Sequence, residues 1–217
     1  MTRMTEPSGR QLHSLTTPRA AALAGVVFAL LFAAVLVALR LPEPATSTRL
    51  RISIVLTPFA GIAFLWFIGV VRDSLGRLED RFFTTVFIGS GLLFLAMVFA
   101  GTAVEAGLLA GRKAGIEADP EVVAFAHGLL VALTNTYALR MAAVFMMSLA
   151  TIWLRTGLMA RWLVVTTYLV AVSVLIAGDV TPWMTLTFPA WVLVVSLLML
   201  RRPPSGPAVP MPLPDRG

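Results

Sequence analysis

The stretch AFAHGLLVALTNTYALRMAAVFMM, residues 124–147, decides the fold class, because it runs for 24 residues with a single charged side chain, Arg140. About 20 apolar residues in a helix cross the ~30 Å hydrocarbon layer of a bilayer. The whole chain shares this character: 58% of its 217 residues are hydrophobic, 13% are charged, and the mean hydropathy is +0.88. A soluble domain needs much less apolar surface to fill its core. The sequence therefore predicts an all-α, polytopic membrane protein.

Apolar runs of this kind recur along the chain and predict six transmembrane helices in a single bundle. We expect the spans at about 20–39, 52–71, 82–104, 132–154, 162–178 and 182–200, which form one domain over residues 20–202. Residues 1–19 form a polar, basic tail. Residues 203–217 are rich in proline and are expected to form an extended, disordered tail.

The fourth apolar run is too long for a simple span. Residues 122–154 would make a helix about 50 Å long. Residues 122–133 therefore either extend this helix beyond the membrane or form a separate interfacial segment, with a break near Gly128 or at residues 134–136. We expect a helix that protrudes from the membrane or is kinked at its outer end.

The basic residues predict the orientation, since cytoplasmic loops carry the excess of Arg and Lys. The N-terminal tail, residues 72–81, residues 155–161 and the C-terminal tail hold 3, 3, 2 and 3 of them, or 11 in total, against 5 in the other three loops. Both termini are therefore expected in the cytoplasm. Tryptophans favour membrane boundaries, and the numbering places Trp66, Trp153 and Trp162 near the cytoplasmic boundary and Trp183 near the outer one.

Arg140 is the candidate functional residue, because an arginine inside a span requires a partner or a wet cavity. It lies 15 residues before Arg155, so it is roughly 22 Å above the cytoplasmic boundary and in the outer third of the bilayer. Two acids, Glu105 and Asp179, fall at a similar level, and Thr136 and Tyr137 precede Arg140 on its helix face. One interpretation is a structural ion pair of Arg140 with either acid, which we favour. The other is an outward-facing polar vestibule in which Arg140 binds an anionic group.

Few residues could carry catalysis or bind a cofactor. The chain has no cysteine and only two histidines, His13 in the tail and His127 in the fourth run, so haem, iron–sulfur and zinc-protease patterns do not occur. We predict no catalytic residues, no metal and no cofactor. Were the protein an enzyme, Glu105, Arg140, Asp179 and His127 would be the candidates. His127 points about 140° away from Arg140 on a continuous helix and is not expected in the same site.

A stripe of small residues marks a packing face on the first span. Ala21, Gly25, Ala29 and Ala33 recur every four residues, which lets the backbone of another helix approach closely. We expect this face to serve packing and not ligand binding.

One loop motif resembles that of a known family. Residues 69–77, GVVRDSLGR, are similar to the cytoplasmic loop motif of the major facilitator superfamily at Gly69, Asp73, Gly76 and Arg77. Ser74 stands where that family carries a basic residue, and no second set of six spans follows. We interpret the match as local and assign the chain to no family.

These features favour an integral membrane protein that acts as a non-enzymatic accessory or structural component of the membrane. The alternative is a small dimeric transporter or permease with an outward-facing vestibule at Arg140. Its expected partners are the lipid bilayer and either further copies of itself or other membrane proteins. Nucleic acid is excluded because the net charge of +6 is spread over short loops. The arginine-rich, alanine-rich composition indicates a bacterial plasma membrane.

Overall fold

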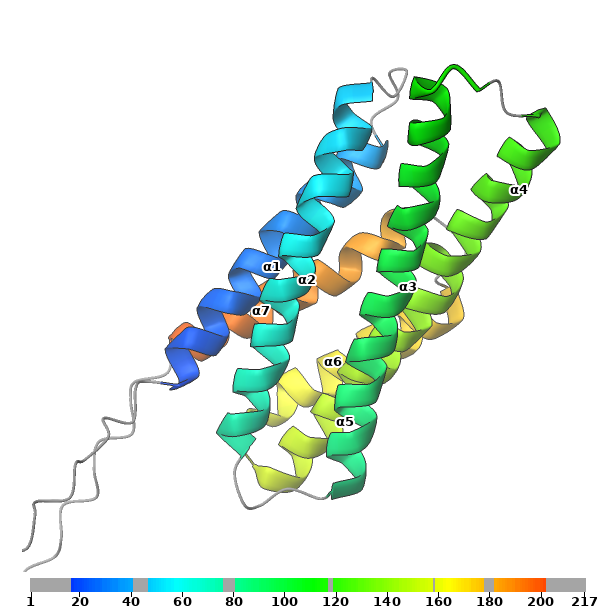
Figure 1. The fold of residues 1–217 in the computed structure, drawn as a ribbon. Coiled ribbons are helices and arrows are strands. Elements are labelled where there is room, and N and C mark those ends of the chain that lie inside the picture. Colours follow the sequence, from blue (N-terminus) through cyan, green and yellow to red (C-terminus); the bar gives the residue numbers. More distant parts are fainter. Residues whose placement is uncertain are drawn as a thin grey trace, which may run out of the picture.

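The computed structural model of the chain describes residues 17–40, 47–75, 81–116, 119–157, 159–177 and 182–201. Residues 1–16 of the N-terminal tail, residues 203–217 with their expected disorder, and the candidate residue Asp179 lie outside these ranges. The described elements, shown in Figure 1, are α1 (Thr17–Arg40), α2 (Ser47–Leu75), α3 (Arg81–Lys113), α4 (Pro120–Val131), the π-helix η2 (Ala132–Ala138), α5 (Leu139–Thr156), α6 (Arg161–Ala177), the 3-10 helix η3 (Pro182–Leu186) and α7 (Thr187–Leu200).

The prediction of a multi-pass helical membrane protein is confirmed. Within the described ranges, five helical segments have the length and hydropathy to cross a membrane, namely Ala22–Leu39, Thr48–Asp73, Phe82–Lys113, Pro120–Thr156 and Trp183–Leu200. Helix α6 is apolar from Arg161 to Ile176 but shorter. Large apolar side chains cover the outside of the bundle, with Leu30 58% and Ile176 78% exposed. Such a surface is stable in lipid and not in water.

The long fourth run forms one helical rod, so residues 122–131 extend the helix and are not a separate segment. The rod begins where the Asp119 side chain accepts a hydrogen bond from the Glu121 backbone N–H at 2.9 Å, with Pro120 in the first turn. The break expected at residues 134–136 takes the form of η2, in which the helix widens to i→i+5 hydrogen bonds. Helix α4 has no buried residue, since it leans away from α1 and α2.

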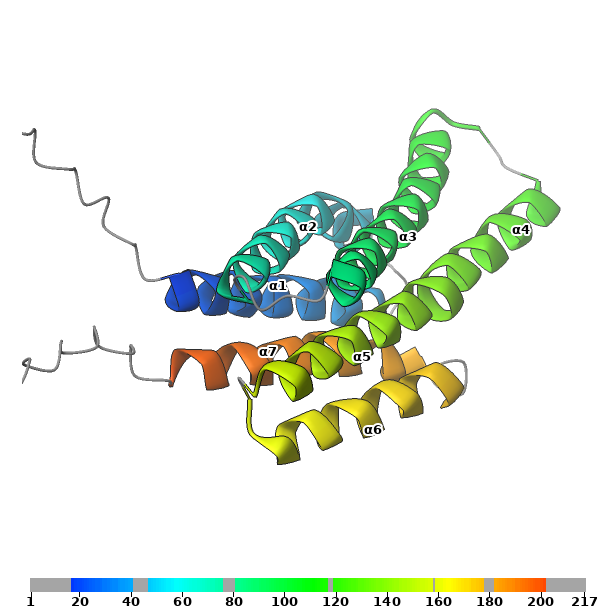
Figure 2. The same cartoon turned by 90° about the horizontal axis from the view of Figure 1, so that it is seen from below.

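The helices alternate in direction, so that their ends gather at two opposite poles of the bundle. Figures 1 and 2 agree that the start of α1, the end of α2, the start of α3, the junction of α5 with α6 and the end of α7 lie at one pole. The end of α1, the start of α2, the end of α3, the start of α4, the end of α6 and η3 lie at the other pole. Helix α1 packs against both α2 and α7, and α3 and α5 pack together beside them.

Aromatic rings fill the centre of the bundle, where α1, α2, α3, α5 and α7 meet. The Phe64 ring lies 4.6 Å from Phe28, 5.2 Å from Phe145 and 5.7 Å from Phe188 between ring centroids. Trp153, expected near the cytoplasmic boundary, lies in the last turn of α5, where its ring is 2% exposed and packs 6.2 Å from Trp191. The ring therefore faces the core and not the lipid, because position along a helix does not reveal which face is buried. Trp66, Trp162 and Trp183 are exposed, as a boundary position requires.

Small residues bring α1, α2 and α7 into close contact, as the stripe on the first span predicts. Gly25 and Ala29 are buried. A Cβ atom built on Gly25 would overlap the Ser196 hydroxyl of α7 and come within 2.8 Å of the Phe67 ring of α2. On the far side of α7, the Trp191 indole donates a buried hydrogen bond to the Thr167 hydroxyl of α6 at 3.0 Å. This contact fastens α6 to the bundle.

Candidate functional site

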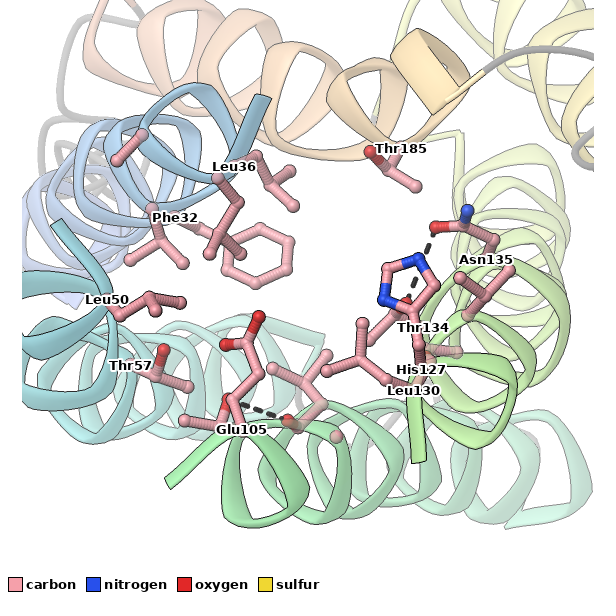
Figure 3. A pocket seen from close by; sticks show the side chains of 18 of the residues that line it. Phe32, Leu36, Leu50, Thr57, Glu105, His127, Leu130, Thr134, Asn135 and Thr185 are labelled. Atoms are coloured by element: carbon pink, nitrogen blue, oxygen red, sulfur yellow. Dashed lines mark hydrogen bonds between the residues drawn. The ribbon is translucent and has the colours of Figure 1, made fainter. Parts of the chain in front are cut away.

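A cavity of about 480 Å³ lies between α1, α2, α3 and α4, at the pole that holds the end of α1, the start of α2, the end of α3 and the start of α4. It lies within the size range of small-molecule sites, which is roughly 300–1,000 Å³. Figure 3 shows side chains from all these helices and from η2 turned into one space. The cavity exists because α4 leans away from α1 and α2. Its main contact with another long helix is with α3.

The deep end of the cavity is apolar and aromatic. Phe32 of α1, Phe94 of α3 and Phe188 of α7 line it and are themselves part of the aromatic core. Ring centroids are 5.6 Å apart for Phe32 and Phe94 and 4.7 Å apart for Phe94 and Phe188, with tilted or edge-to-face geometry. These packed rings form a rigid floor against which an apolar group can lie.

Polar groups line the cavity above this floor. Thr57 donates its hydroxyl hydrogen to the Ser53 carbonyl at 2.8 Å, and Thr102 donates to the Val98 carbonyl at 2.9 Å. Thr134 donates to the Leu130 carbonyl at 2.8 Å and lies 3.4 Å from the Asn135 side-chain oxygen. Such i→i−4 bonds satisfy each hydroxyl hydrogen within its own helix, so that the oxygen keeps its lone pairs for a ligand.

Glu105 and His127 face each other across the cavity. Figure 3 shows the Glu105 carboxylate reaching in from α3 and the His127 ring reaching in from α4. Both line the cavity. Within the described part of the chain, Glu105 makes no hydrogen bond or ion pair through its side chain. The carboxylate is therefore available to a molecule that enters.

Two arginines stand at the rim. Arg112 lies in the last turn of α3 and Arg49 in the first turn of α2, and both contribute to the cavity wall near the helix ends. Arg112 is seven residues beyond Glu105 on the same helix, which places it about 10 Å further out. The cavity thus passes from a cationic rim through a polar middle to an apolar floor.

The structure separates Arg140 from this cavity. Its guanidinium donates a hydrogen bond to the Thr136 backbone carbonyl at 3.0 Å, within η2, and Arg140 is not among the described residues that line the cavity. Tyr137 is 56% exposed on the outside of the helix. The structure therefore does not bring Glu105 and Arg140 into one site. Pairing of Arg140 with Asp179 stays a prediction because Asp179 lies outside the described residues.

Sequence reasoning missed that Glu105 and His127 line the same cavity, although the sequence holds a signal for it. Glu105 is eight residues before the end of α3 at Lys113, and His127 is seven residues after the start of α4 at Pro120. Consecutive helices joined by a short loop run antiparallel, so equal offsets from the loop place two residues at the same level. The spacing could therefore have predicted a shared level, though not that both side chains turn inward.

The geometry defines a multi-pass helical membrane protein with a ligand-sized cavity at one pole. No protein-family model, no curated protein and no solved structure matches the chain. Among the residues that the structure describes, no group of three or more His, Asp or Glu side chains is placed to hold a metal ion.

Proposed function

We propose that the chain crosses the plasma membrane of a bacterium six times and keeps both termini in the cytoplasm. Support comes from the helix directions and from charge. The pole that holds the start of α1 and the end of α7 adjoins segments with 11 Arg and Lys residues, against 5 for the opposite pole. Helix α6 supplies the sixth crossing, because 17 residues suffice for the thinnest membrane regions. The cavity then opens toward the outside.

Reporter fusions test this threading. A reporter that is active only outside the cytoplasm, fused after Ala45, Arg77, Gly115 or Gly157, should give signal at Ala45 and Gly115 alone. The charge difference is the reason, since arginine-rich loops resist translocation. Signal from the Arg77 or Gly157 fusion would contradict the proposed orientation.

We infer that the protein is a non-enzymatic membrane component whose activity is to bind an amphipathic small molecule in the cavity. One observation carries this proposal: a ligand-sized space that grades from a charged rim to a floor of packed aromatic rings. An amphipathic molecule matches that gradient, because its apolar part leaves water for the floor while its polar part stays among polar side chains. A position at the membrane surface gives access from both lipid and water.

The π-helix favours a second candidate, a small permease that works as a dimer. Thr134 and Asn135 of η2 line the cavity, and π-helical turns often lie at functional sites where a helix changes shape. Interrupted helices beside a binding site are typical of transporters. In this alternative the cavity is the outward-facing vestibule. Uptake of a bound molecule into proteoliposomes would favour the permease, whereas binding without uptake would favour the accessory protein.

Filling the cavity tests the binding role. Ala126 lines the cavity, whereas Ala124, two residues earlier on α4, is exposed and does not. With 4-phenylbutanol as a neutral probe, the melting temperature in mild detergent should rise with probe concentration for the wild type and for Ala124→Trp. For Ala126→Trp we expect the apparent affinity to fall by about tenfold or more, because the indole occupies the site.

The matched pair also controls for partition of the probe into detergent, which is the same for both variants. Equal stabilisation of Ala126→Trp and Ala124→Trp would contradict binding in the cavity.

A further inference from the structure

The α2–α3 wall of the cavity presents hydrogen-bond acceptors. Thr57 and Thr102 have already donated their hydroxyl hydrogens to Ser53 and Val98, so toward the cavity their oxygens can only accept. Thr102 and Glu105 are three residues apart on α3 and share a face of that helix. An ionised carboxylate is also an acceptor alone. Below the arginine rim, the α2–α3 wall thus offers three oxygen-bearing side chains, which call for a hydrogen-bond donor on the ligand.

The wall formed by α4 and η2 is compatible with a ligand that donates hydrogen bonds to the α2–α3 wall. His127 and Asn135 each carry both donor and acceptor atoms, so they adapt to whatever polar group the ligand presents. Thr134 already donates its hydroxyl hydrogen to the Leu130 carbonyl. The selectivity of the cavity for a donor or an acceptor is therefore set by the α2–α3 wall.

Charge favours a cation at the level of Glu105. Within the described residues no cationic side chain pairs with this carboxylate, and the partly buried site strengthens an ion pair over one in water. Arg112 is exposed and stands about 10 Å further out than Glu105, and half-buried Arg49 lies eight residues, or about 12 Å, before Thr57 on α2. These separations weaken the repulsion of a cation bound at Glu105. The Phe32, Phe94 and Phe188 rings beneath attract cations through their faces and accept apolar groups.

We propose that the ligand of this cavity is a lipophilic amine, whose ammonium group donates to Glu105, Thr102 and Thr57 and whose apolar body rests on the aromatic floor. This inference rests on the proposed binding role and specifies its ligand class. It assigns to Glu105 the recognition of the ammonium and to the phenylalanines the recognition of the apolar body. Arg112, which is exposed, and Arg49, which is half-buried, then stand at the rim near the helix ends.

Three probes with one apolar body test the inference: 4-phenylbutylamine, 4-phenylbutanol and 4-phenylbutanoate. Binding to the purified full-length protein in mild detergent is measured by titration calorimetry at neutral pH, where the amine is cationic. We expect the amine to bind about tenfold more tightly than the alcohol, and the carboxylate most weakly, because a charge-assisted hydrogen bond is stronger than a neutral one. Glu105→Gln should reduce the amine affinity about tenfold and leave the alcohol affinity unchanged.

Glu121→Gln is the matched control, since Glu121 is an exposed acid on α4 that does not line the cavity. Its amine affinity should equal that of the wild type. Glu105→Asp keeps the charge and should retain a measurable preference for the amine over the alcohol, which Glu105→Gln should not. These variants separate charge recognition from a general effect on folding.

The outcomes separate the inference from the function on which it rests. Equal affinities for the amine and the alcohol, or tighter binding of the carboxylate, would overturn the amine and leave amphiphile binding in place, provided that Ala126→Trp weakens that binding by about tenfold or more. An unchanged amine affinity in Glu105→Gln would overturn the role of Glu105. Absence of binding by all three probes would overturn both the amine and the binding role.

Discussion

Replacement of Gly25 by leucine should destabilise the bundle by roughly 3 kcal/mol or more, because overpacking of a tight helix contact costs about 1–3 kcal/mol and here affects three helices. A Cβ atom at this position already overlaps the Ser196 hydroxyl and lies 2.8 Å from the Phe67 ring. The larger side chain would push α1 away from both α2 and α7. Unfolding in mixed micelles by a denaturing detergent gives the free energy directly.

Two comparisons between variants test whether close packing at Gly25 causes the loss of stability. Gly69 on α2 is exposed, and a Cβ there would meet nothing within 4 Å, so Gly69→Leu should change the free energy of unfolding by under about 0.5 kcal/mol. The smaller change Gly25→Ala should be partly rescued by Ser196→Ala, which removes the overlapping hydroxyl. Similar losses for Gly25→Leu and Gly69→Leu would show that close packing at Gly25 does not hold the helices together.

Replacement of Phe188 by alanine should cost about 2–4 kcal/mol, less than the ~3–5 kcal/mol typical of soluble cores. The reduction follows because lipid is as apolar as the protein interior, so the loss comes from packing alone. That packing is extensive. The Phe188 ring is 0% exposed and pairs with the rings of Phe28, Phe64, Phe94, Phe145 and Trp191.

The same unfolding measurement checks this value against two controls. Phe188→Leu keeps much of the volume and should cost under half as much. Phe125→Ala removes a ring that is 72% exposed on α4 and should be nearly neutral. A loss from Phe125→Ala as large as that from Phe188→Ala would contradict the view that the aromatic centre, and not lipid contact, holds the helices together.

The sequence predicted the features that depend on position along one helix. Long apolar runs predicted the membrane class, and the four-residue repeat around Gly25 predicted a close helix contact that the structure confirms. Features that depend on the rotation of a helix about its axis were not predicted from the sequence. Trp153 was placed at the membrane boundary from its numbering, yet it turns into the core. One sequence alone does not reveal which face of a helix packs against a neighbouring helix.

The arrangement of the candidate site was not predicted for a related reason, although Glu105 and His127 were both named as candidate residues. Arg140 stood out because a charge in an apolar run is rare, whereas Glu105 and His127 lie near helix ends where charges are common. The structure shows the Arg140 guanidinium bonded to a carbonyl of its own helix, at the π-helical turn. The same Thr136 carbonyl also accepts the Leu139 backbone N–H, so Arg140 adds a second donor at this turn. The cavity arises because α4 leans away from α1 and α2, and no local sequence pattern predicts this tilt.

The most direct test of the central claim, that this cavity binds a ligand, uses the absence of cysteine from the chain. Ala126→Cys and Ala124→Cys each introduce a single thiol, one in the cavity wall and one on the exposed face of the same helix. The rate of maleimide labelling is measured with and without 4-phenylbutylamine in the purified protein. The account predicts that the amine slows labelling at position 126 by about tenfold at saturation and leaves position 124 unchanged. Equal labelling rates at position 126 with and without the amine, or equal protection at both positions, would contradict it.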